Sequence, residues 1–331
     1  MKSIIGTLIL MASLVSCSNN DETLVPNIQE EAVPVVKATA TYNVLVQEDV
    51  IYAEGLSHES INSANATTIP LKLDIYTPDN TITNRPVYLF IHGGGFIGGN
   101  KKGSTILNLA NYYTSRGWVF ISINYRLRDD NGTVPQEWLD FSETYPSPTN
   151  AQIRAMYPAQ RDAKAALRWL VANAPTYNIN TDYITVGGGS AGAITAITVS
   201  VSNPEDFKDE IDTVQDPTLS STNPEQSYKV QTIINHWGSK SPLDILELVY
   251  GHQRFDSNDP ALFIVHGTED ATVPFSRAEE LKEIYEANGL PLAFYPLEGL
   301  GHSVWDATVN GKRLEELAFD FIVAQQKLKV E

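Results

Sequence analysis

The chain has 331 residues, of which 42% are hydrophobic and 19% are charged. This composition is typical of a globular protein with a sizeable core, and we expect one large domain rather than two small ones. The formal net charge of −17 disfavours nucleic acid and anionic lipid headgroups as partners, because an acidic surface repels both.

The first residues have the features of a targeting segment. Lys2 precedes an apolar stretch from Ile4 to Val15, which is too short to span a bilayer as a stable helix. The stretch ends in Leu14-Val15-Ser16-Cys17, which is similar to a bacterial lipobox. That resemblance implies that Cys17 is diacylated and becomes the first residue of the mature chain. The alternative is an ordinary cleaved signal peptide followed by a chance cysteine.

These features divide the chain into three parts. We expect a lipoprotein signal peptide over 1–16, a flexible tether over 17–40 and one folded domain over 41–331. Cys17 is the only cysteine, so no internal disulfide can form. A lipid anchor there would place the protein in the bacterial cell envelope, at the outer membrane, with the anchor as its only membrane contact.

Apolar patterning predicts strands at intervals along the folded part. The segments 42–53 and 71–76 alternate polar and apolar residues, which predicts an antiparallel entry hairpin. Continuous apolar runs are typical of buried parallel strands. Such runs occupy 87–91 and 119–124, and further strands are expected over 183–186, 230–236, 262–266 and 292–296.

Helices are predicted between most of these strands. Helical spacing of apolar residues covers 104–115, 159–174, 190–200, 276–288 and 311–327. The alternation of strand and helix predicts an α/β fold with a mostly parallel, doubly wound sheet and helices on both faces. Two segments, 128–150 and 203–227, break the alternation. Long irregular loops are usually functional or disordered, so 128–150 is a candidate lid.

A predicted nucleophile follows the strand over 183–186. Ser190 lies in Gly188-Gly189-Ser190-Ala191-Gly192, a G-x-S-x-G pattern between that strand and an Ala-rich helix. Such a strand-to-helix turn is so tight that side chains at the flanking positions would clash, and it exposes the serine hydroxyl. A phosphate-binding turn is the alternative, but no Lys follows the serine as a P-loop requires.

A glycine run supplies candidate oxyanion donors. His92-Gly93-Gly94-Gly95 follows the strand over 87–91 and presents backbone N–H groups free of side chains. We expect Gly94, Gly95 and Ala191 to form an oxyanion hole, in which one donor typically stabilises the transition state by about 3–4 kcal/mol. His92 is expected to fix this loop rather than to act as a base.

The acid and base are expected near the C-terminus. Asp270 follows the strand over 262–266 and is favoured over its neighbour Glu269 as the residue that orients an imidazole. Among the six histidines, only His302 lies in a glycine-framed loop after that acid. His266 is expected to be structural, and His236, which ends a strand, is a candidate to line the pocket.

Aromatic residues offer a candidate substrate wall. Trp138, Tyr157 and Trp237 are the members to which we assign substrate binding, with Phe141 and Tyr145 as further candidates. Each is equally compatible with core or lid packing. No cluster of histidine, cysteine and carboxylate side chains has metal-ligand spacing, so the sequence predicts no metal and no other cofactor.

These pieces predict acyl transfer through an acyl-enzyme. His302 would take the proton of Ser190, Ser190 would attack an ester carbonyl, and Asp270 would hold the imidazole in place. The order glycine run, serine, acid and histidine along the chain is that of α/β-hydrolases.

The chain from about Leu71 to Lys327 resembles the HGGG-bearing carboxylesterases of the α/β-hydrolase superfamily. Besides the catalytic segments, Asn124-Tyr125-Arg126-Leu127, Tyr157-Pro158-Ala159-Gln160-x-Asp162 and His266-Gly267-Thr268-x-Asp270-x-x-Val273-Pro274 look like family motifs. The resemblance implies hydrolysis of short- to medium-acyl or aryl esters without a cofactor, on small molecules or on polysaccharides. The motifs are similar both to the acetyl- and feruloyl-esterase-like branch of this family and to its hormone-sensitive-lipase-like branch. Gly189 departs from the pattern, because these families often carry Asp, Glu or His there.

Two other readings stay open. A prolyl-oligopeptidase-like serine peptidase shares the sheet and the triad, but it usually carries Tyr after the nucleophile, where this chain has Ala191. A non-catalytic binding protein on the same fold usually loses a member of the triad, and this chain keeps all three.

Overall fold

The computed structural model describes residues 32–331. The predicted signal peptide, Cys17 and most of the predicted tether lie outside these residues. The fold begins earlier than the expected boundary at residue 41. Strand β1 (Val35–Val36) pairs in parallel with β12 (Lys329–Val330), and the side chain of Val36 is fully buried. The expectation of a flexible tether up to residue 40 is therefore wrong for this part, because burial of Val36 fixes the chain to the domain.

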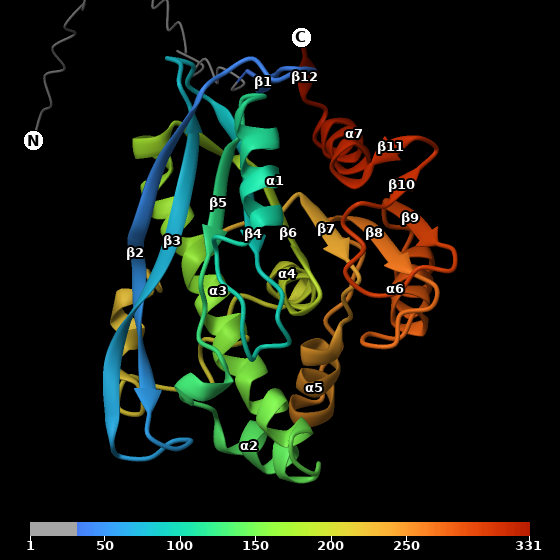
Figure 1. The fold of residues 1–331 in the computed structure, drawn as a ribbon. Helices are drawn as coiled ribbons and strands as arrows, with labels where there is room; N and C mark the ends of the chain where they lie inside the picture. The colour runs from blue at the N-terminus through green and yellow to red at the C-terminus, as the bar shows by residue number, and fades with distance from the viewer. Residues whose placement is uncertain (1–31) are drawn as a thin grey trace, which may run out of the picture. The chain divides into compact units, whose positions relative to one another are not determined.

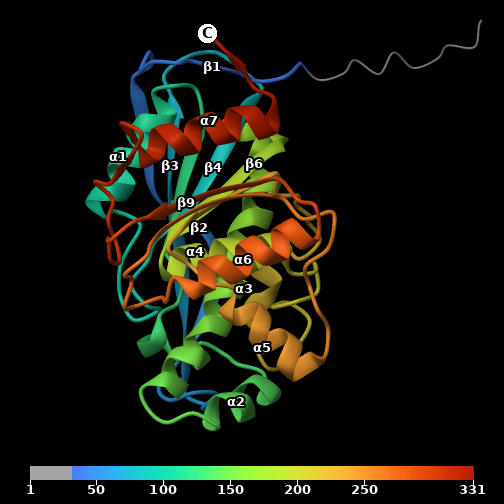
Figure 2. The same ribbon diagram turned by 90° about the vertical axis from the view of Figure 1, so that its right-hand side faces the viewer.

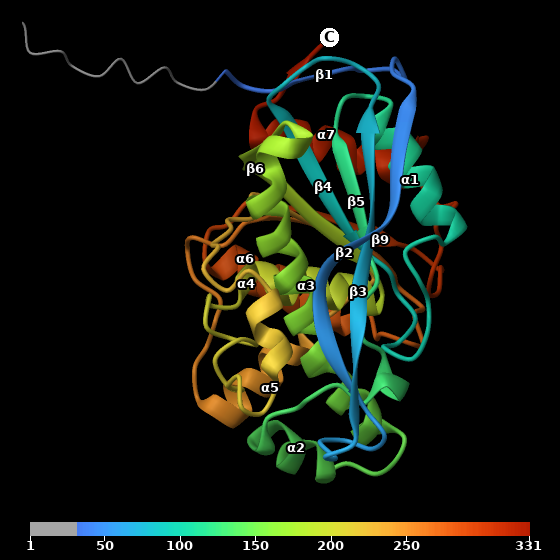
Figure 3. The ribbon, with the colours of Figure 1, turned by 90° about the vertical axis from the view of Figure 1, so that its left-hand side faces the viewer.

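One eight-stranded sheet forms the centre of the domain, with the strand order β2-β3-β5-β4-β6-β7-β8-β9. The first two strands are antiparallel neighbours, β3 is antiparallel to β5, and all later pairs are parallel. Figure 3 shows the long β2–β3 hairpin at one edge. The strands are β2 (Val44–His58), β3 (Ala66–Pro78), β4 (Arg85–Ile91), β5 (Val119–Ile123), β6 (Ile179–Gly189), β7 (Thr232–His236), β8 (Ala261–Gly267) and β9 (Leu292–Leu297).

Helices cover both faces of this sheet, as the alternation predicts. They are α1 (Ser104–Thr114), α2 (Gln136–Glu143), α3 (Thr149–Tyr177), α4 (Ala191–Val201), α5 (Ser241–Tyr250), α6 (Ser276–Ala287) and α7 (Leu314–Gln326). Helix α1 lies in front of the sheet and α3 behind it (Figure 1). The view from the β9 edge shows α7, α6 and α5 (Figure 2). A small hairpin joins β10 (Thr308–Val309) to β11 (Lys312–Arg313).

Strand β4 shows why the sheet is buried on both faces. Its seven residues are all buried, and successive side chains point to opposite faces. Tyr88 and Phe90 belong to a core cluster that also contains residues of α1 and α7, whereas Val87, Leu89 and Ile91 belong to a cluster that contains residues of α3, α4, α5 and α6. The apolar run is therefore continuous because each face of the sheet is covered by its own hydrophobic core.

The segment 128–150, expected to be irregular, contains helix α2 and the first two residues of α3. Helix α3 begins ten residues before the predicted start at Ala159 and continues through Pro158. A proline inside a helix removes one hydrogen bond. Burial of Ile153, Ala155 and Tyr157 on the same helix outweighs that cost.

The parallel strands bring four segments to one edge of the sheet. The glycine run follows β4, Ser190 follows β6, Asp270 follows β8 and His302 follows β9. Because the carboxyl ends of parallel strands meet at the same edge, residues far apart in sequence become neighbours there. Within residues 32–331, none of the helices is both long and apolar enough to cross a membrane.

Candidate active site

The turn between β6 and α4 holds Ser190 in a strained backbone conformation. Its φ is +54°, a region that residues other than glycine rarely adopt. The N–H of Ser190 donates to the carbonyl oxygen of His236 at 2.9 Å, which fixes the turn to the end of β7. A Cβ atom at Gly192 would lie 2.0 Å from the carbonyl oxygen of Ile91, and one at Gly188 would lie 2.3 Å from the carbonyl carbon of Gly192. Both glycines of the pattern are therefore required by backbone contacts.

A hydrogen-bonded line connects the three polar side chains named from the sequence. Oγ of Ser190 lies 2.9 Å from Nε2 of His302, and Nδ1 of His302 lies 2.7 Å from Oδ2 of Asp270. The His302 side chain is 18% exposed, while that of Asp270 has no exposed surface. A serine hydroxyl, a partly accessible imidazole and a buried carboxylate in this order can activate the hydroxyl as a nucleophile.

The carboxylate of Asp270 is fixed on both of its oxygens. Oδ1 accepts the N–H groups of Thr272 at 2.8 Å and Val273 at 2.9 Å, while Oδ2 faces His302. Burial alone would raise the pKa of Asp270, but the hydrogen bonds from His302, Val273 and Thr272 hold that pKa below its usual value. Glu269, the alternative acid, is exposed. The structure thus directs Asp270, and not its neighbour, at the imidazole.

His266 also reaches this carboxylate. Its Nε2 lies 2.8 Å from the carbonyl oxygen of Val273 and 3.2 Å from Oδ2 of Asp270. Burial lowers the pKa of His266, so the ring is neutral at physiological pH and its Nε2–H donates to the carbonyl oxygen of Val273. His266 therefore supports the turn that carries Asp270.

The glycine run forms a rigid loop beside Ser190. His92 is buried, its Nδ1 lies 2.7 Å from the carbonyl oxygen of Gly93, and its ring stacks on Tyr125 at 4.4 Å. Burial lowers the pKa of His92 to about 4, so this ring stays neutral at physiological pH. Gly94 has φ of +118°, and a Cβ atom there would lie 2.0 Å from the carbonyl oxygen of Gly98. The loop therefore needs glycine at this position.

Backbone donors around Ser190 are free to bind a ligand. Gly94 and Gly95 line the cavity at Ser190, and the N–H of Ala191 opens helix α4 directly after it. None of these three N–H groups donates to an acceptor within residues 32–331. Free backbone donors at a helix N-terminus and a glycine loop stabilise negative charge that develops on a carbonyl oxygen.

A cavity of about 360 Å3 opens above Ser190. Two indole side chains are among its lining residues: Trp237 is fully buried, and Trp305 is partly buried. The cavity is lined by Gly93, Gly94, Gly95, Gly189, Ser190, Trp237, Thr272, His302, Ser303 and Trp305.

Two of the three residues expected to bind substrate are not at this cavity. Trp138 and Tyr157 are fully buried and pack edge-to-face or tilted against each other and against Phe207. Nε1 of Trp138 donates to the carbonyl oxygen of Ile153, which ties the indole to α3. Both aromatic residues belong to the core, so the assignment of a substrate wall to them is wrong. Trp237 does line the cavity, as expected.

The segment 128–150 does not line the cavity, so the structure gives it no place in the wall of the site. Just past this segment, Nε2 of Gln152 donates to the carbonyl oxygen of Gly95 at 3.1 Å. His236, the other pocket candidate, lies behind the cavity with its ring 4.6 Å from that of Trp305.

Sequence reasoning missed Trp305, Thr272 and Ser303. Trp305 comes three residues after His302 and Thr272 two residues after Asp270, so proximity to the predicted catalytic residues is the signal that points to them. Within residues 32–331, no group of three or more histidine, cysteine or carboxylate residues has the arrangement of a metal site.

Comparisons with known proteins agree with this geometry. The family model BD-FAE matches residues 73–144 and 149–254. The chain is 22% identical to Esterase LipC of Mycobacterium tuberculosis over 238 residues, which cover 66% of this chain and 52% of that protein. It is 30% identical to Carboxylesterase 1C of Rattus norvegicus over 176 residues, which cover 50% of this chain and 29% of that protein. The chain thus spans about half the length of its curated relatives, or less.

Solved structures share the fold over most of the chain. A butyrate-bound esterase of Thermogutta terrifontis aligns with a TM-score of 0.58 and 19% identity over 86% of this chain and 94% of that chain. Esterase 2 of the same organism, phosphorylated by paraoxon, gives a TM-score of 0.59 and 22% identity over 84% and 94%. The likeness confirms the α/β-hydrolase fold expected from the sequence.

Proposed function

This chain belongs to the BD-FAE family, and on that premise we propose that it is a serine carboxylesterase that works through Ser190, His302 and Asp270. The observation that carries the proposal is the hydrogen-bonded line from Oγ of Ser190 through His302 to Asp270. The esterase names of its curated relatives support the same reaction class.

Acylation begins at the Ser190 hydroxyl. Nε2 of His302 accepts the hydroxyl proton while Oγ attacks the ester carbonyl carbon. Asp270 stabilises the imidazolium that forms and holds its Nδ1–H, and hence the ring orientation. The N–H groups of Gly94, Gly95 and Ala191 donate to the oxyanion, and each such donor is worth about 3 kcal/mol in a water-excluded site.

Collapse of the tetrahedral intermediate breaks the bond to the alcohol oxygen. The His302 imidazolium gives its proton to that oxygen, the alcohol leaves, and the acyl group stays on Ser190. A water molecule then takes the place of the alcohol, loses a proton to His302 and attacks the acyl-enzyme. The second intermediate releases a carboxylic acid and returns the proton to Oγ of Ser190.

Short- to medium-acyl or aryl esters are the proposed substrates, on small molecules or on polysaccharides. The cavity at Ser190 has room for a small acyl group and one attached group, and its walls are glycine backbone and indole rather than charged side chains. We also propose that Cys17 carries a lipid anchor in the bacterial envelope, which would bring the enzyme close to polymer-linked esters. Replacing Cys17 by Ala should then release the protein from the membrane fraction.

The test of the reaction is hydrolysis of p-nitrophenyl esters from acetate to decanoate by the chain starting at residue 32. Ser190→Ala should abolish turnover of every ester, while its thermal unfolding stays close to that of the parent chain. Ser200→Ala is a matched control on the same helix, because Oγ of Ser200 donates only to the carbonyl oxygen of Ala196. Activity of Ser190→Ala near that of the parent would refute the proposal.

An active-site-directed fluorophosphonate separates the catalytic reading from a binding protein on the same fold. Labelling of the parent and of Ser200→Ala, but not of Ser190→Ala, is expected. Absence of labelling in the parent would favour the non-catalytic reading. Cleavage of prolyl peptide substrates with no ester turnover would favour the peptidase reading.

A further inference from the structure

Gly189, the residue before the nucleophile, faces an indole. A Cβ atom at position 189 would lie 2.6 Å from Cζ2 and 3.2 Å from Cη2 of Trp305, and 3.5 Å from Nε1 of Trp237. Heavy atoms of folded proteins do not approach to 2.6 Å without a bond or hydrogen bond. The place where a side chain at 189 would lie is therefore already filled by Trp305. This accounts for glycine at position 189.

Trp305 is held in this place by aromatic neighbours. Its ring lies 4.7 Å from that of Trp237 at an interplanar angle of 75°, 4.6 Å from that of His236 and 6.2 Å from that of Phe90. All three neighbours are almost completely buried. Edge-to-face packing against buried rings gives a rigid wall rather than a mobile side chain.

The position of this wall relative to the reacting atoms identifies the part of the ester that it meets. In the tetrahedral intermediate, the oxyanion points to the N–H groups of Gly94, Gly95 and Ala191, and the alcohol oxygen points to Nε2 of His302. The acyl carbon takes the remaining direction. Apart from Ser190, His302 and the oxyanion glycines, the cavity is lined by Gly93, Gly189, Trp237, Thr272, Ser303 and Trp305. Of these, Trp305 is the large apolar side chain that keeps exposed surface, so it is the one that an acyl chain can meet.

We propose that Trp305 is the specificity-determining residue of this site, and that it restricts the acyl group to short chains. The inference rests on the proposed esterase function and names the acyl class of that same site. Trp305 occupies the space into which a longer chain would extend, and the absence of a side chain at Gly189 leaves room for the indole.

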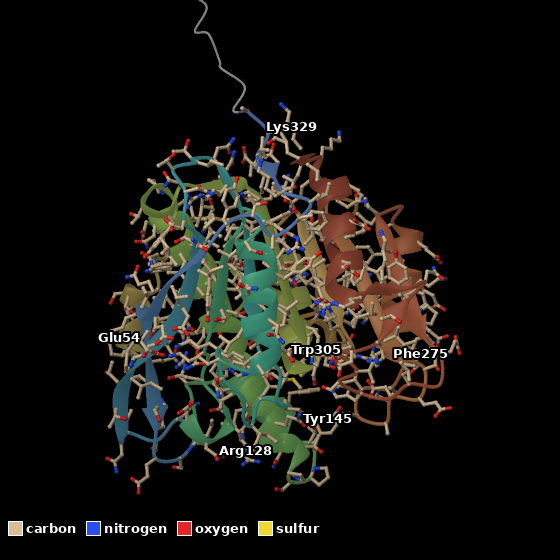
Figure 4. All side chains as sticks on the ribbon, turned by 45° about the horizontal axis from the view of Figure 1, so that its top comes forward. Glu54, Arg128, Tyr145, Phe275, Trp305 and Lys329 are labelled. Carbon is tan, nitrogen blue, oxygen red and sulfur yellow. The ribbon has the colours of Figure 1, made fainter. Side chains whose placement is uncertain are left out.

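The test compares acyl-chain preference in the parent, Trp305→Phe and Trp305→Ala, from residue 32 onward. The quantity is kcat/KM for p-nitrophenyl octanoate divided by that for the acetate. Trp305→Ala should raise this ratio at least tenfold, and Trp305→Phe by less, because each added methylene gains space and apolar contact. Tyr145→Ala is the matched control, since Tyr145 is exposed and is separate from Trp305 in Figure 4.

Varying the alcohol of acetate esters tests the direction assigned to the acyl group. An unchanged octanoate-to-acetate ratio in an active Trp305→Ala variant would overturn the inference, and so would a change of preference confined to the alcohol series. Either result would leave the esterase proposal intact. Absence of ester turnover in the parent would instead contradict the esterase function, and the inference with it.

A double substitution tests the pairing of the two residues directly. Gly189→Ala should lower kcat/KM for the acetate at least tenfold, because the new Cβ displaces Trp305 beside the nucleophile. Gly189→Ala combined with Trp305→Ala should recover much of that loss, since the atoms that collide are gone. Thermal unfolding of each variant identifies any that fail to fold. Equal losses in the single and double variants, with both folded, would show that Trp305 is not what excludes a side chain at 189.

Discussion

Oδ2 of Asp270 lies 2.7 Å from Nδ1 of His302 and 3.2 Å from Nε2 of His266. One carboxylate oxygen therefore has an imidazole on each side, one facing the cavity and one fully buried. The other oxygen is held by two backbone N–H groups. Such a carboxylate has no freedom to turn, which fixes the tautomer and the plane of the His302 ring.

Replacing Asp270 by Asn keeps this shape and removes the charge. An amide N–H2 facing Nδ1 favours the wrong tautomer of His302, so we expect kcat to fall by about three to four orders of magnitude. Glu269→Gln is the control, because Glu269 is adjacent but exposed, and it should retain activity. Ester hydrolysis at saturating substrate measures both. Similar losses in the two variants would contradict the assignment of the acid.

Gly192 tests the nucleophile turn. Its ideal Cβ would lie 2.0 Å from the carbonyl oxygen of Ile91, so Gly192→Ala must move α4 away from β4 or distort the turn at Ser190. We expect a loss of several kcal/mol in the free energy of unfolding, the range of severe steric strain in a core. Gly103→Ala, where the nearest atom would be 3.7 Å away, should change stability little. Urea unfolding distinguishes these outcomes.

The catalytic segments could be predicted from sequence because each follows an apolar run. A buried strand such as 87–91 leaves a clear pattern, and the polar residues after it mark the carboxyl edge of the sheet. The order of the segments along the chain then limits how they can meet. Local pattern and chain order were enough to name Ser190, Asp270 and His302, which the structure brings within hydrogen-bond distance.

The cavity wall could not be predicted in this way. Trp138 lies in α2 and Trp305 in the loop after His302, and the position of each indole depends on residues distant in sequence. Trp138 packs on Phe207, whereas Trp305 packs on Trp237 and His236. Contacts between residues this far apart in sequence have no local signature. Helix α5 does have a local signature, a proline at its start and apolar residues at helical spacing. It was not predicted, because two strands were expected to follow each other directly there.

A buried ion pair joins two of the sequence motifs that look like family motifs. The guanidinium and backbone N–H of Arg126 make four hydrogen bonds to the carboxylate of Asp162, and both side chains are almost fully buried. Removing one partner of a buried pair leaves an uncompensated charge, which typically costs about 3–5 kcal/mol. Asp162→Asn should lower the free energy of unfolding by that amount. Asp129→Asn, which breaks an exposed pair with Arg128, should leave it nearly unchanged. Equal losses in the free energy of unfolding of the two variants, measured by chemical denaturation, would show that burial of the Arg126–Asp162 pair does not set its contribution.

Two buried histidines predict that stability falls in mild acid. Burial lowers the pKa of His92 and of His236 to about 4, whereas the unfolded chain titrates them near 6.5. Between pH 4 and pH 6.5 the unfolded chain binds more protons than the folded chain. The free energy of unfolding therefore has its full value above pH 6.5 and decreases as the pH falls toward 4. Each histidine should contribute a loss of about 2 kcal/mol between pH 7 and pH 5.

His236→Asn isolates one of these contributions. An asparagine amide can still donate to the carbonyl oxygen of Gly188, which Nδ1 of His236 reaches at 3.0 Å, but it does not titrate. Burial raises the pKa of Asp259 to about 7, which gives a pH dependence of the opposite sign, and comparison with the parent cancels it because both proteins keep Asp259. From pH 7 to pH 5 the parent should therefore lose about 2 kcal/mol more of its free energy of unfolding than the variant. A parallel pH dependence in His236→Asn and the parent would mean that His236 is protonated in the folded protein.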